Sequence, residues 1–143
     1  MFDPGTPDAG QGAELRHRVR AADGVVLGTP MYHGSYASPL KNALDYCGFD
    51  EFEDTTVGLL VVAGGGFPTP ALEHLRSVAR ALDAWVLPQQ VAIPSADSVF
   101  EDGRVTDDDL RERIATLGTE VVEYAGVDSY PETTTACAVP TAD

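Results

Sequence analysis

Two glycine-containing loops carry the residue types best suited to bind a planar or anionic ligand. The first, TPMYHGSYA at residues 29–37, combines a proline, aromatic residues, a glycine and a serine. The second, AGGGFPTP at residues 63–70, has three glycines that let backbone approach a ring closely, and Phe67 offers an apolar wall. Each loop follows an apolar run and precedes a helical pattern, so we expect its backbone N–H groups to face a ligand.

The other polar residues do not form a second chemical centre. No serine, histidine and aspartate are arranged for nucleophilic catalysis, and no histidine or cysteine spacing fits a zinc site. His17 and His74 lie between charged residues on helical patterns, so we expect both at the surface. The acidic run at 107–109 precedes a helix, where carboxylates interact favourably with the helix dipole, and we interpret it as a helix start.

The elements around these loops predict an α/β fold with a parallel sheet. Apolar runs without polar alternation, typical of strands buried on both faces, cover residues 25–29, 57–63 and 85–87, the last resuming at 91–93. Helical spacing covers 13–22, 39–47, 70–82 and 110–124, with N-caps predicted at Ser38, Thr69 and Thr106. Such an order requires right-handed crossovers and helices on both faces of the sheet, and ligands bind beyond the carboxyl ends of its strands.

The length of 143 residues and the 43% hydrophobic content suit one domain. We predict an extended loop over residues 1–12, the α/β domain over 13–126, and a disordered tail over 127–143, where periodicity vanishes. Cys47 and Cys137 are expected to be unpaired thiols, with Cys47 acting as a small core residue.

The charge balance is strongly acidic, with 23 acidic against 9 basic residues and a formal net charge of −14. Because phosphate binding needs a basic patch, nucleic acid is not an expected partner. Lys41 is the single lysine, and an acidic, lysine-poor surface suits a halophilic, salt-rich cytoplasm, although an ordinary acidic mesophile protein is the alternative. No apolar run approaches the roughly 20 residues of a membrane span, so we expect a cytoplasmic protein without membrane contact.

The two loops resemble those of the NADPH-dependent FMN reductase family, a branch of the flavodoxin-like flavoproteins. In that family a Pro-Glu-Tyr-Asn-Gly-Ser loop precedes a Leu-Lys-Asn-Ala-(Leu/Ile)-Asp helix; PMYHGS at 30–35 and LKNALD at 40–45 are similar to them. A glycine loop after the next strand and an aspartate-glycine turn before the last helix extend the resemblance over residues 13–125. The resemblance implies a flavodoxin-like, three-layer α/β/α fold.

The resemblance also implies a cofactor, FMN, and the residues beside its ring. Carried over by position, they are Pro30, Met31, Tyr32, His33 and Gly34 on one side, and Gly64, Gly65 and Gly66 on the other. Met31 stands where the family commonly has Glu and His33 where it has Asn, so backbone contacts can carry over but side-chain tuning of the flavin is not assumed. Two alternatives stay open: Tyr32 packs on its own loop, and His33 is a solvated loop residue.

A flavodoxin-like sheet has five strands, and this sequence predicts three. The first strand, its phosphate-binding loop and the second strand find no counterpart upstream of residue 13, so we expect the run at 25–29 to be an exposed apolar edge. The simplest interpretation is that Met1 is an internal methionine taken as the start. A natural short variant is the alternative.

The activity implied by the resemblance is that of an FMN-dependent oxidoreductase. NAD(P)H reduces the flavin, and the flavin reduces a second acceptor such as a quinone, a free flavin, an azo compound or a metal oxyanion. No catalytic side chain is expected, because the flavin carries the chemistry. The resemblance further implies a homodimer or homotetramer. The alternatives are a non-catalytic electron carrier or binding module and an inactive remnant.

Overall fold

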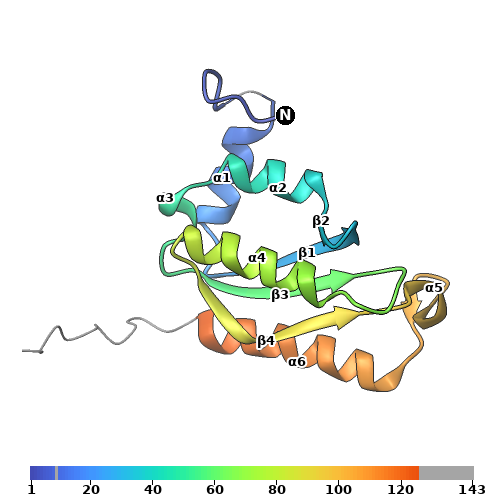
Figure 1. Cartoon of the computed structure of the whole chain (residues 1–143). Helices are drawn as coiled ribbons and strands as arrows, with labels where there is room; N and C mark the ends of the chain where they lie inside the picture. The colour runs from blue at the N-terminus through green and yellow to red at the C-terminus, as the bar shows by residue number, and fades with distance from the viewer. Residues whose placement is uncertain (9, 126–143) are drawn as a thin grey trace, which may run out of the picture.

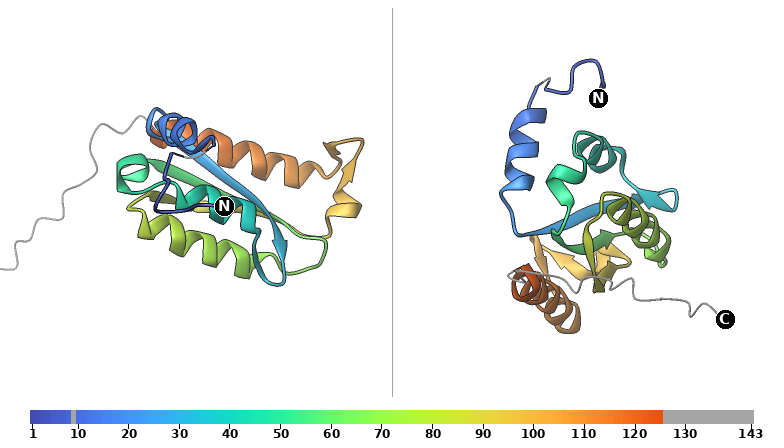
Figure 2. Two further views of the ribbon diagram at one scale, coloured as in Figure 1. Left: turned by 90° about the horizontal axis from the view of Figure 1, so that it is seen from above. Right: turned by 90° about the vertical axis from the view of Figure 1, so that its left-hand side faces the viewer.

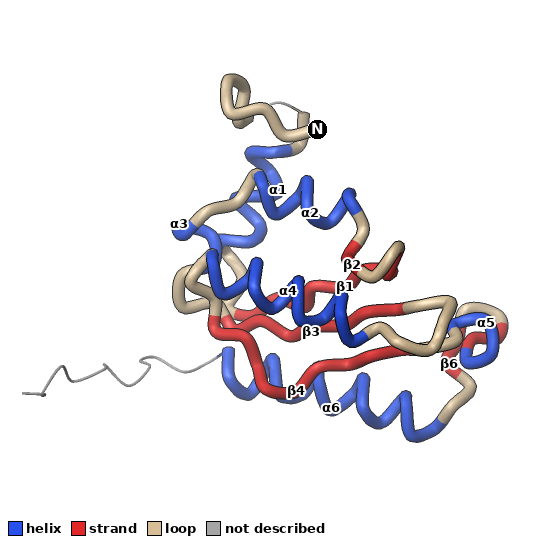
Figure 3. The backbone as a smooth tube through the Cα atoms, in the orientation of Figure 1, coloured by secondary structure: helices blue, strands red, loops and turns tan. Residues whose placement is uncertain are grey.

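The structure is a computed structural model that describes residues 1–8 and 10–125. Helices and strands alternate along most of its length (Figures 1 and 3). The helices are α1 (Gly12–Arg20), α2 (Ser38–Asp45), α3 (Phe49–Phe52), α4 (Thr69–Ala81), α5 (Ala96–Val99) and α6 (Asp108–Ala125). The strands are β1 (Gly24–Tyr32), β2 (Ser35–Tyr36), β3 (Thr56–Val62), β4 (Trp85–Ile93), β5 (Phe100–Glu101) and β6 (Arg104–Val105).

The central sheet confirms the predicted α/β fold. Its strand order is β2-β1-β3-β4, with β1, β3 and β4 parallel and β2 antiparallel to β1. Helix α4 covers one face and α6 the other, so the molecule has three layers (Figure 2). The arrowheads of β1, β3 and β4 point to the end of the sheet where α5 and the β5–β6 hairpin lie (Figure 1). Both predicted ligand loops leave the sheet at this end.

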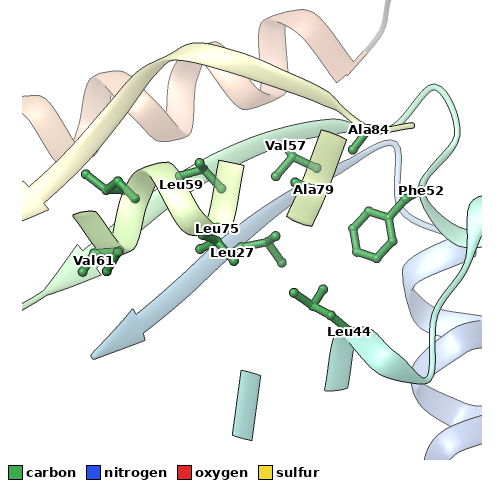
Figure 4. Close-up of a cluster of buried hydrophobic side chains, with 11 residues drawn as sticks. Leu27, Leu44, Phe52, Val57, Leu59, Val61, Leu75, Ala79 and Ala84 are labelled. Atoms are coloured by element: carbon green, nitrogen blue, oxygen red, sulfur yellow. The ribbon is translucent and has the colours of Figure 1, made fainter. Parts of the chain in front are cut away.

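Two apolar clusters lie on opposite faces of the sheet, because the side chains of a strand alternate between faces. Val57, Leu59 and Val61 of β3 are fully buried and pack with Leu72 and Leu75 of α4 (Figure 4 shows this cluster). The cluster on the other face joins β4 to α6 through Leu87, Val91, Ile93, Leu110, Leu117 and Val121. Because both faces of these strands are buried, their residues form continuous hydrophobic runs in the sequence.

Helix α6 lies very close to the sheet because glycines face it. A methyl group added at Gly58 of β3 would lie 2.7 Å from Cγ2 of Val121, and one added at Gly24 of β1 would lie 2.9 Å from its Cγ1. Real side chains do not approach this closely, so larger residues at either strand position would push α6 away. These two glycines therefore set the depth at which the last helix packs.

The predicted helix caps are wrong by one residue. Ser38 and Thr69 are the first residues of α2 and α4, whose N-caps are Ala37 and Pro68 without a side-chain cap. In α6 the cap is Asp107, whose Oδ1 accepts a hydrogen bond of 2.8 Å from the backbone N–H of Leu110. Thr106 was the predicted cap, but its hydroxyl donates to the Val99 carbonyl instead. The tertiary contacts of these residues thus override their local capping preference.

Strand β4 runs through Pro88, where the sequence predicted a break. Its register with β3 shifts between Val57 and Leu59, so residues 87–89 form a bulge. Arg76 of α4 donates to the carbonyl of Leu87 (2.9 Å) and thereby satisfies an acceptor in the bulge. Proline is tolerated here because β4 is an edge strand of the described sheet.

The short helix α3, which the sequence did not predict, locks the N-terminal helix onto the domain. Glu51 is 4% exposed at its side chain and accepts hydrogen bonds from Arg20 of α1 and from the backbone N–H of Gly48. Cys47 is half-buried beside it. Burial and the nearby Glu51 carboxylate raise the pKa of the Cys47 thiol from 9.0 to about 11, so the thiol is neutral at ordinary pH.

The remaining sequence predictions concern the edge of the sheet, the C-terminal segment and membrane-spanning helices. Val26 of β1 is 48% exposed, and the outer edge of β1 pairs with β2 only at Met31 and Tyr32, as expected for an exposed apolar edge among the described residues. Cys137 and the predicted disordered tail at 127–143 lie outside the described residues. Within the described residues, no helix has the length and apolar character that crossing a bilayer requires.

Candidate functional site

The two predicted ligand loops leave neighbouring parallel strands at the same level of the sheet. Pro30 of β1 is in register with Val62 of β3, and each loop begins at the next residue. Residues 31–34 and 63–66 are therefore adjacent at the carboxyl edge, which is where open parallel sheets bind ligands. The sheet topology thus places the eight residues that the sequence singled out in two segments at the same edge of the sheet.

The first loop is a hairpin and not the irregular loop that the sequence predicted. β1 continues through Pro30 to Tyr32 and turns back into β2, with Met31 opposite Tyr36 and Tyr32 opposite Ser35. The tight turn is made by His33 and Gly34, whose φ angles are 51° and 83°. Two successive positive φ angles define a type I′ turn, the form that suits a two-residue hairpin.

The positive φ at residue 33 explains why the FMN reductase motif commonly has Asn where this chain has His33. Asn and Gly adopt positive φ at little cost, and His is among the few other residues enriched there. His33 is exposed and makes no hydrogen bond to another described residue. Its backbone geometry therefore matches the motif although its side chain differs, and its exposed side chain is compatible with both interpretations left open for it.

A buried threonine anchors the base of this hairpin. Thr29 is 3% exposed, and its hydroxyl oxygen accepts a hydrogen bond of 3.0 Å from the backbone N–H of Ala37. The same hydroxyl donates to the carbonyl of Pro30 at 3.0 Å. Thr29 thus ties the end of β1 to the start of α2, and the hairpin projects from a fixed base.

The second loop is unusually open around its three glycines. A methyl group added at Gly64, Gly65 or Gly66 would meet no atom within 4 Å, and none of the three has a positive φ. Neither sterics nor backbone conformation within the chain therefore requires glycine at these positions. The space that side chains would otherwise occupy on this loop is open, as expected where a flat ligand approaches the backbone.

Hydrogen bonds hold the glycine loop from one side only. The carbonyl of Gly65 accepts a 3.0 Å bond from the Ser95 N–H, and the carbonyl of Ala63 accepts one of 3.0 Å from the Ala96 N–H. In the described part of the chain, the N–H groups of residues 64–66 donate to no other residue. The loop is therefore fixed through its carbonyl groups while its donors stay available.

Two large side chains flank the loops without burying themselves. Tyr32 is 63% exposed on the hairpin, and Phe67 is 83% exposed beside the glycines. Tyr32 therefore does not gain burial by packing on its own loop, which removes the support for that alternative. Met31, in contrast, is partly buried against the core cluster, so its side chain supports the hairpin from below.

These features fit an isoalloxazine ring. The ring has an apolar face and a polar edge of carbonyl and ring-nitrogen acceptors, and the site offers a backbone cradle without side chains, free N–H donors, and exposed aromatic residues beside both loops. If FMN binds at this edge, the backbone of the hairpin and of the glycine loop would hold its ring. Among the eight residues, only Tyr32 and His33 have side chains capable of acid–base chemistry.

Three cavities of the described chain lie outside the two loops, and one of about 480 Å³ lies at the β5–β6 hairpin, lined by Glu101, Asp102, Arg104, Val105 and Thr106. One of about 660 Å³ is lined by Trp85, Pro88 and Tyr124, at the end where β4 begins. Another of about 400 Å³ lies between α1, α2 and α3 near Cys47. None of these cavities is lined by the two loops, but the carboxyl edge is where free N–H donors and open glycines occur together, so it is the candidate site.

Sequence patterns did not reveal one contact of this site. His74 of α4 lies with its Nδ1 at 3.1 Å from Oγ of Ser35 in the hairpin. It was expected to be a surface residue, and it is exposed, yet it joins two segments 39 residues apart in the chain. No local pattern signals this pair, because the docking of α4 beside β2 creates it.

Comparison with known proteins identifies the family. The sequence profile of NADPH-dependent FMN reductases matches residues 1–98. The chain belongs to the NADPH-dependent FMN reductase family. The match includes both loops and the helix that follows each of them, so the resemblance seen in the motifs is confirmed.

Relatives and structural neighbours of this FMN reductase family member agree with that assignment. The FMN-dependent NADPH-azoreductase of Staphylococcus aureus is 36% identical over 120 residues, which are 82% of this chain and 64% of the relative. An oxidoreductase of Corynebacterium diphtheriae has a TM-score of 0.67 at 22% identity, covering 83% of this chain and 64% of that one. The NAD(P)H:(acceptor) oxidoreductase of Paracoccus denitrificans has a TM-score of 0.64 at 20% identity, covering 87% and 71%.

These comparisons show the fold class and how much of the relatives' length this chain covers. The two structural neighbours confirm the flavodoxin-like fold class, since similarity at that level of identity concerns the fold. The chain spans 64% of the length of the curated relatives that it matches. The activity of the whole protein is therefore taken up below as a proposal.

Proposed function

We propose that this chain contributes the ring-binding side of an FMN site in an NAD(P)H-dependent oxidoreductase. The observation that carries the proposal is the pair of loops at the carboxyl edge, one a tight hairpin and the other an open glycine loop with free N–H donors. When bound, FMN supplies the hydride and electron transfer chemistry. The chain's own residues bind and orient the ring.

The roles of the eight residues follow from this placement. The glycines at 64–66 let the backbone approach the flat face of the ring, and their N–H groups donate to acceptors on its polar edge. The hairpin residues 30–34 form the opposite wall, with Tyr32 extending the apolar surface. An acceptor would bind over the exposed ring face, and the relatives support a small organic acceptor such as an azo compound or a quinone.

Assembly, location and source remain part of the proposal. We place the enzyme in a salt-rich cytoplasm, given its net charge of −14, with a homodimer or homotetramer as its working state. Sedimentation of the purified protein at low and high salt tests both points. A monomer at all salt concentrations would contradict the assembly, and loss of folding on raising the salt would contradict the halophilic assignment.

Flavin titration tests the ring-binding site. We would titrate the purified protein with FMN and with lumiflavin, which has the ring without the phosphate chain, and follow quenching of flavin fluorescence. A ring site predicts saturable binding of both ligands. If neither ligand binds, the proposed site is wrong.

Anaerobic reduction then separates the candidate activities. Adding NADPH or NADH to the flavin-loaded protein should bleach the visible flavin absorbance, and adding an azo dye or a quinone should restore it. A flavin that binds but is reduced only by an artificial reductant would indicate an electron carrier. The two nicotinamide cofactors compared side by side give the donor preference.

A further inference from the structure

The hairpin of the proposed flavin site is fixed at its base but makes few contacts at its tip. Strand β2 has two residues, Ser35 and Tyr36, and a two-stranded ribbon of this length is marginal in isolation. The Thr29 hydroxyl secures the base through Ala37. At the tip, the turn at 33–34 makes no backbone hydrogen bond to the rest of the described chain.

One side chain from α4 reaches the tip. His74 Nδ1 lies 3.1 Å from the Ser35 hydroxyl oxygen, and among the described residues this is the single side-chain hydrogen bond between hairpin and α4. Ser35 is the cross-strand partner of Tyr32, the exposed aromatic residue of the hairpin. A constraint on Ser35 therefore constrains the strand pair that carries Tyr32.

The other end of this contact is rigid. His74 lies between Leu72 and Leu75, which are 1% and 0% exposed and belong to the core, so the backbone of α4 is fixed at this point. The same helix begins at Thr69, immediately after the glycine loop and Phe67. The position of α4 thus determines where the glycine loop lies, and His74 connects the hairpin to that same helix.

We infer that His74 is a positioning residue of the flavin site, which sets the gap between the two loops through its hydrogen bond to Ser35. This inference rests on the proposed function. Without the bond, the hairpin tip samples other positions, and the ring meets a site that is correctly spaced for only part of the time. A neutral, solvent-exposed hydrogen bond contributes about 0.5–1.5 kcal/mol, which corresponds to about a 2- to 12-fold change in population.

The test is a double-mutant cycle on flavin affinity. His74→Ala and Ser35→Ala should each weaken FMN binding by about 2- to 12-fold. The double variant should bind no more weakly than the weaker single variant, because both remove one shared bond. Additive losses in the double variant, or unchanged affinity of His74→Ala, would overturn the inference.

Two further variants separate positioning from a general loss of structure. His74→Asn places an amide near the former Nδ1 and should return the affinity to within about twofold of the unmodified protein. Ser77→Ala is the matched control one turn further along α4, where the hydroxyl bonds only to the Glu73 carbonyl of its own helix, and it should bind FMN normally. Thermal melting of every variant reports whether the fold itself has changed. A failure of His74→Asn to restore binding would count against the hydrogen bond.

A ligand-free measurement keeps this inference distinct from the proposed function. Amide hydrogen exchange at the strand pair Tyr32 and Ser35 should be faster in His74→Ala than in the unmodified protein, in the absence of any flavin. If the unmodified protein does not bind FMN but this difference is present, the proposed function fails while the role of His74 in fixing the hairpin stands. Equal exchange rates in the two proteins would refute that role.

Discussion

Replacing Gly65 by alanine should strengthen the fold and weaken flavin binding. The position has open space around it, with no atom within 4 Å of an added methyl group, and its φ is not positive. In the ligand-free protein the methyl group therefore encounters no clash. Because alanine has fewer conformations than glycine in the unfolded chain, the free energy of unfolding should rise by about 0.4–1 kcal/mol.

The expected effect on binding has the opposite sign. A ring that lies in van der Waals contact with the backbone of residue 65 would occupy the space that the new methyl group takes. Forcing a methyl group into a filled contact costs about 1–3 kcal/mol, which corresponds to about a 5- to 150-fold increase in the dissociation constant for FMN. In this single variant the free energy of unfolding should thus rise while the affinity for FMN falls.

The assay combines urea unfolding without ligand and fluorescence titration with FMN. Gly118→Ala in α6 is the matched control, because its added methyl group also meets no atom within 4 Å. Alanine within a helix should stabilise the protein by about 0.5–1 kcal/mol, and this site is remote from both loops, so flavin affinity should not change. If Gly65→Ala binds FMN as tightly as the unmodified protein, the glycine loop does not lie against the ring.

Three further predictions concern the scaffold. Gly58→Ala should destabilise the protein by about 1–3 kcal/mol in urea unfolding, because the methyl group would lie 2.7 Å from Val121; an unchanged midpoint would contradict the tight packing of α6. His33→Asn should stabilise the hairpin by up to about 1 kcal/mol, since Asn tolerates the φ of 51° better; a lower melting temperature would argue against the type I′ turn. The raised pKa of Cys47, about 11 against 9.0 when exposed, makes the unfolded thiol ionise first as pH rises, so stability should fall between pH 9 and 11. Cys47→Ala should show a smaller fall over that window, and parallel curves would refute the shift.

The three parallel strands were predictable because burial on both faces leaves continuous apolar runs in the sequence. Val57, Leu59 and Val61 face one apolar cluster and the residues between them face the other side of the sheet, so β3 has no polar position to interrupt the run. The same logic failed at Pro88, since a proline in an apolar run normally ends a strand. Here the strand continues because β4 lies at the edge of the described sheet and a bulge accommodates the proline, while the Arg76 side chain satisfies the Leu87 carbonyl.

The helix starts were less predictable because capping is decided by tertiary contacts. Ser38 and Thr69 have good capping side chains, but each lies one residue inside its helix. For Ser38 the cause is visible: Ala37 gives its N–H to the buried Thr29 hydroxyl and adopts the extended cap conformation. A residue eight positions away thus moves the start of α2, and no local rule contains that information.

The candidate site shows the same division between local and non-local information. The glycines at 64–66 and the His-Gly turn are local devices, and their types follow from what their own backbone or a close ligand demands, so sequence patterns found them. The spacing between the two loops is not local, because it depends on how α4 docks against β2 and on the contact of His74 with Ser35. A flat ring held on both faces is sensitive to that spacing above all. The residues proposed to contact the cofactor could therefore be selected from the sequence, whereas the contact of His74 with Ser35 could not.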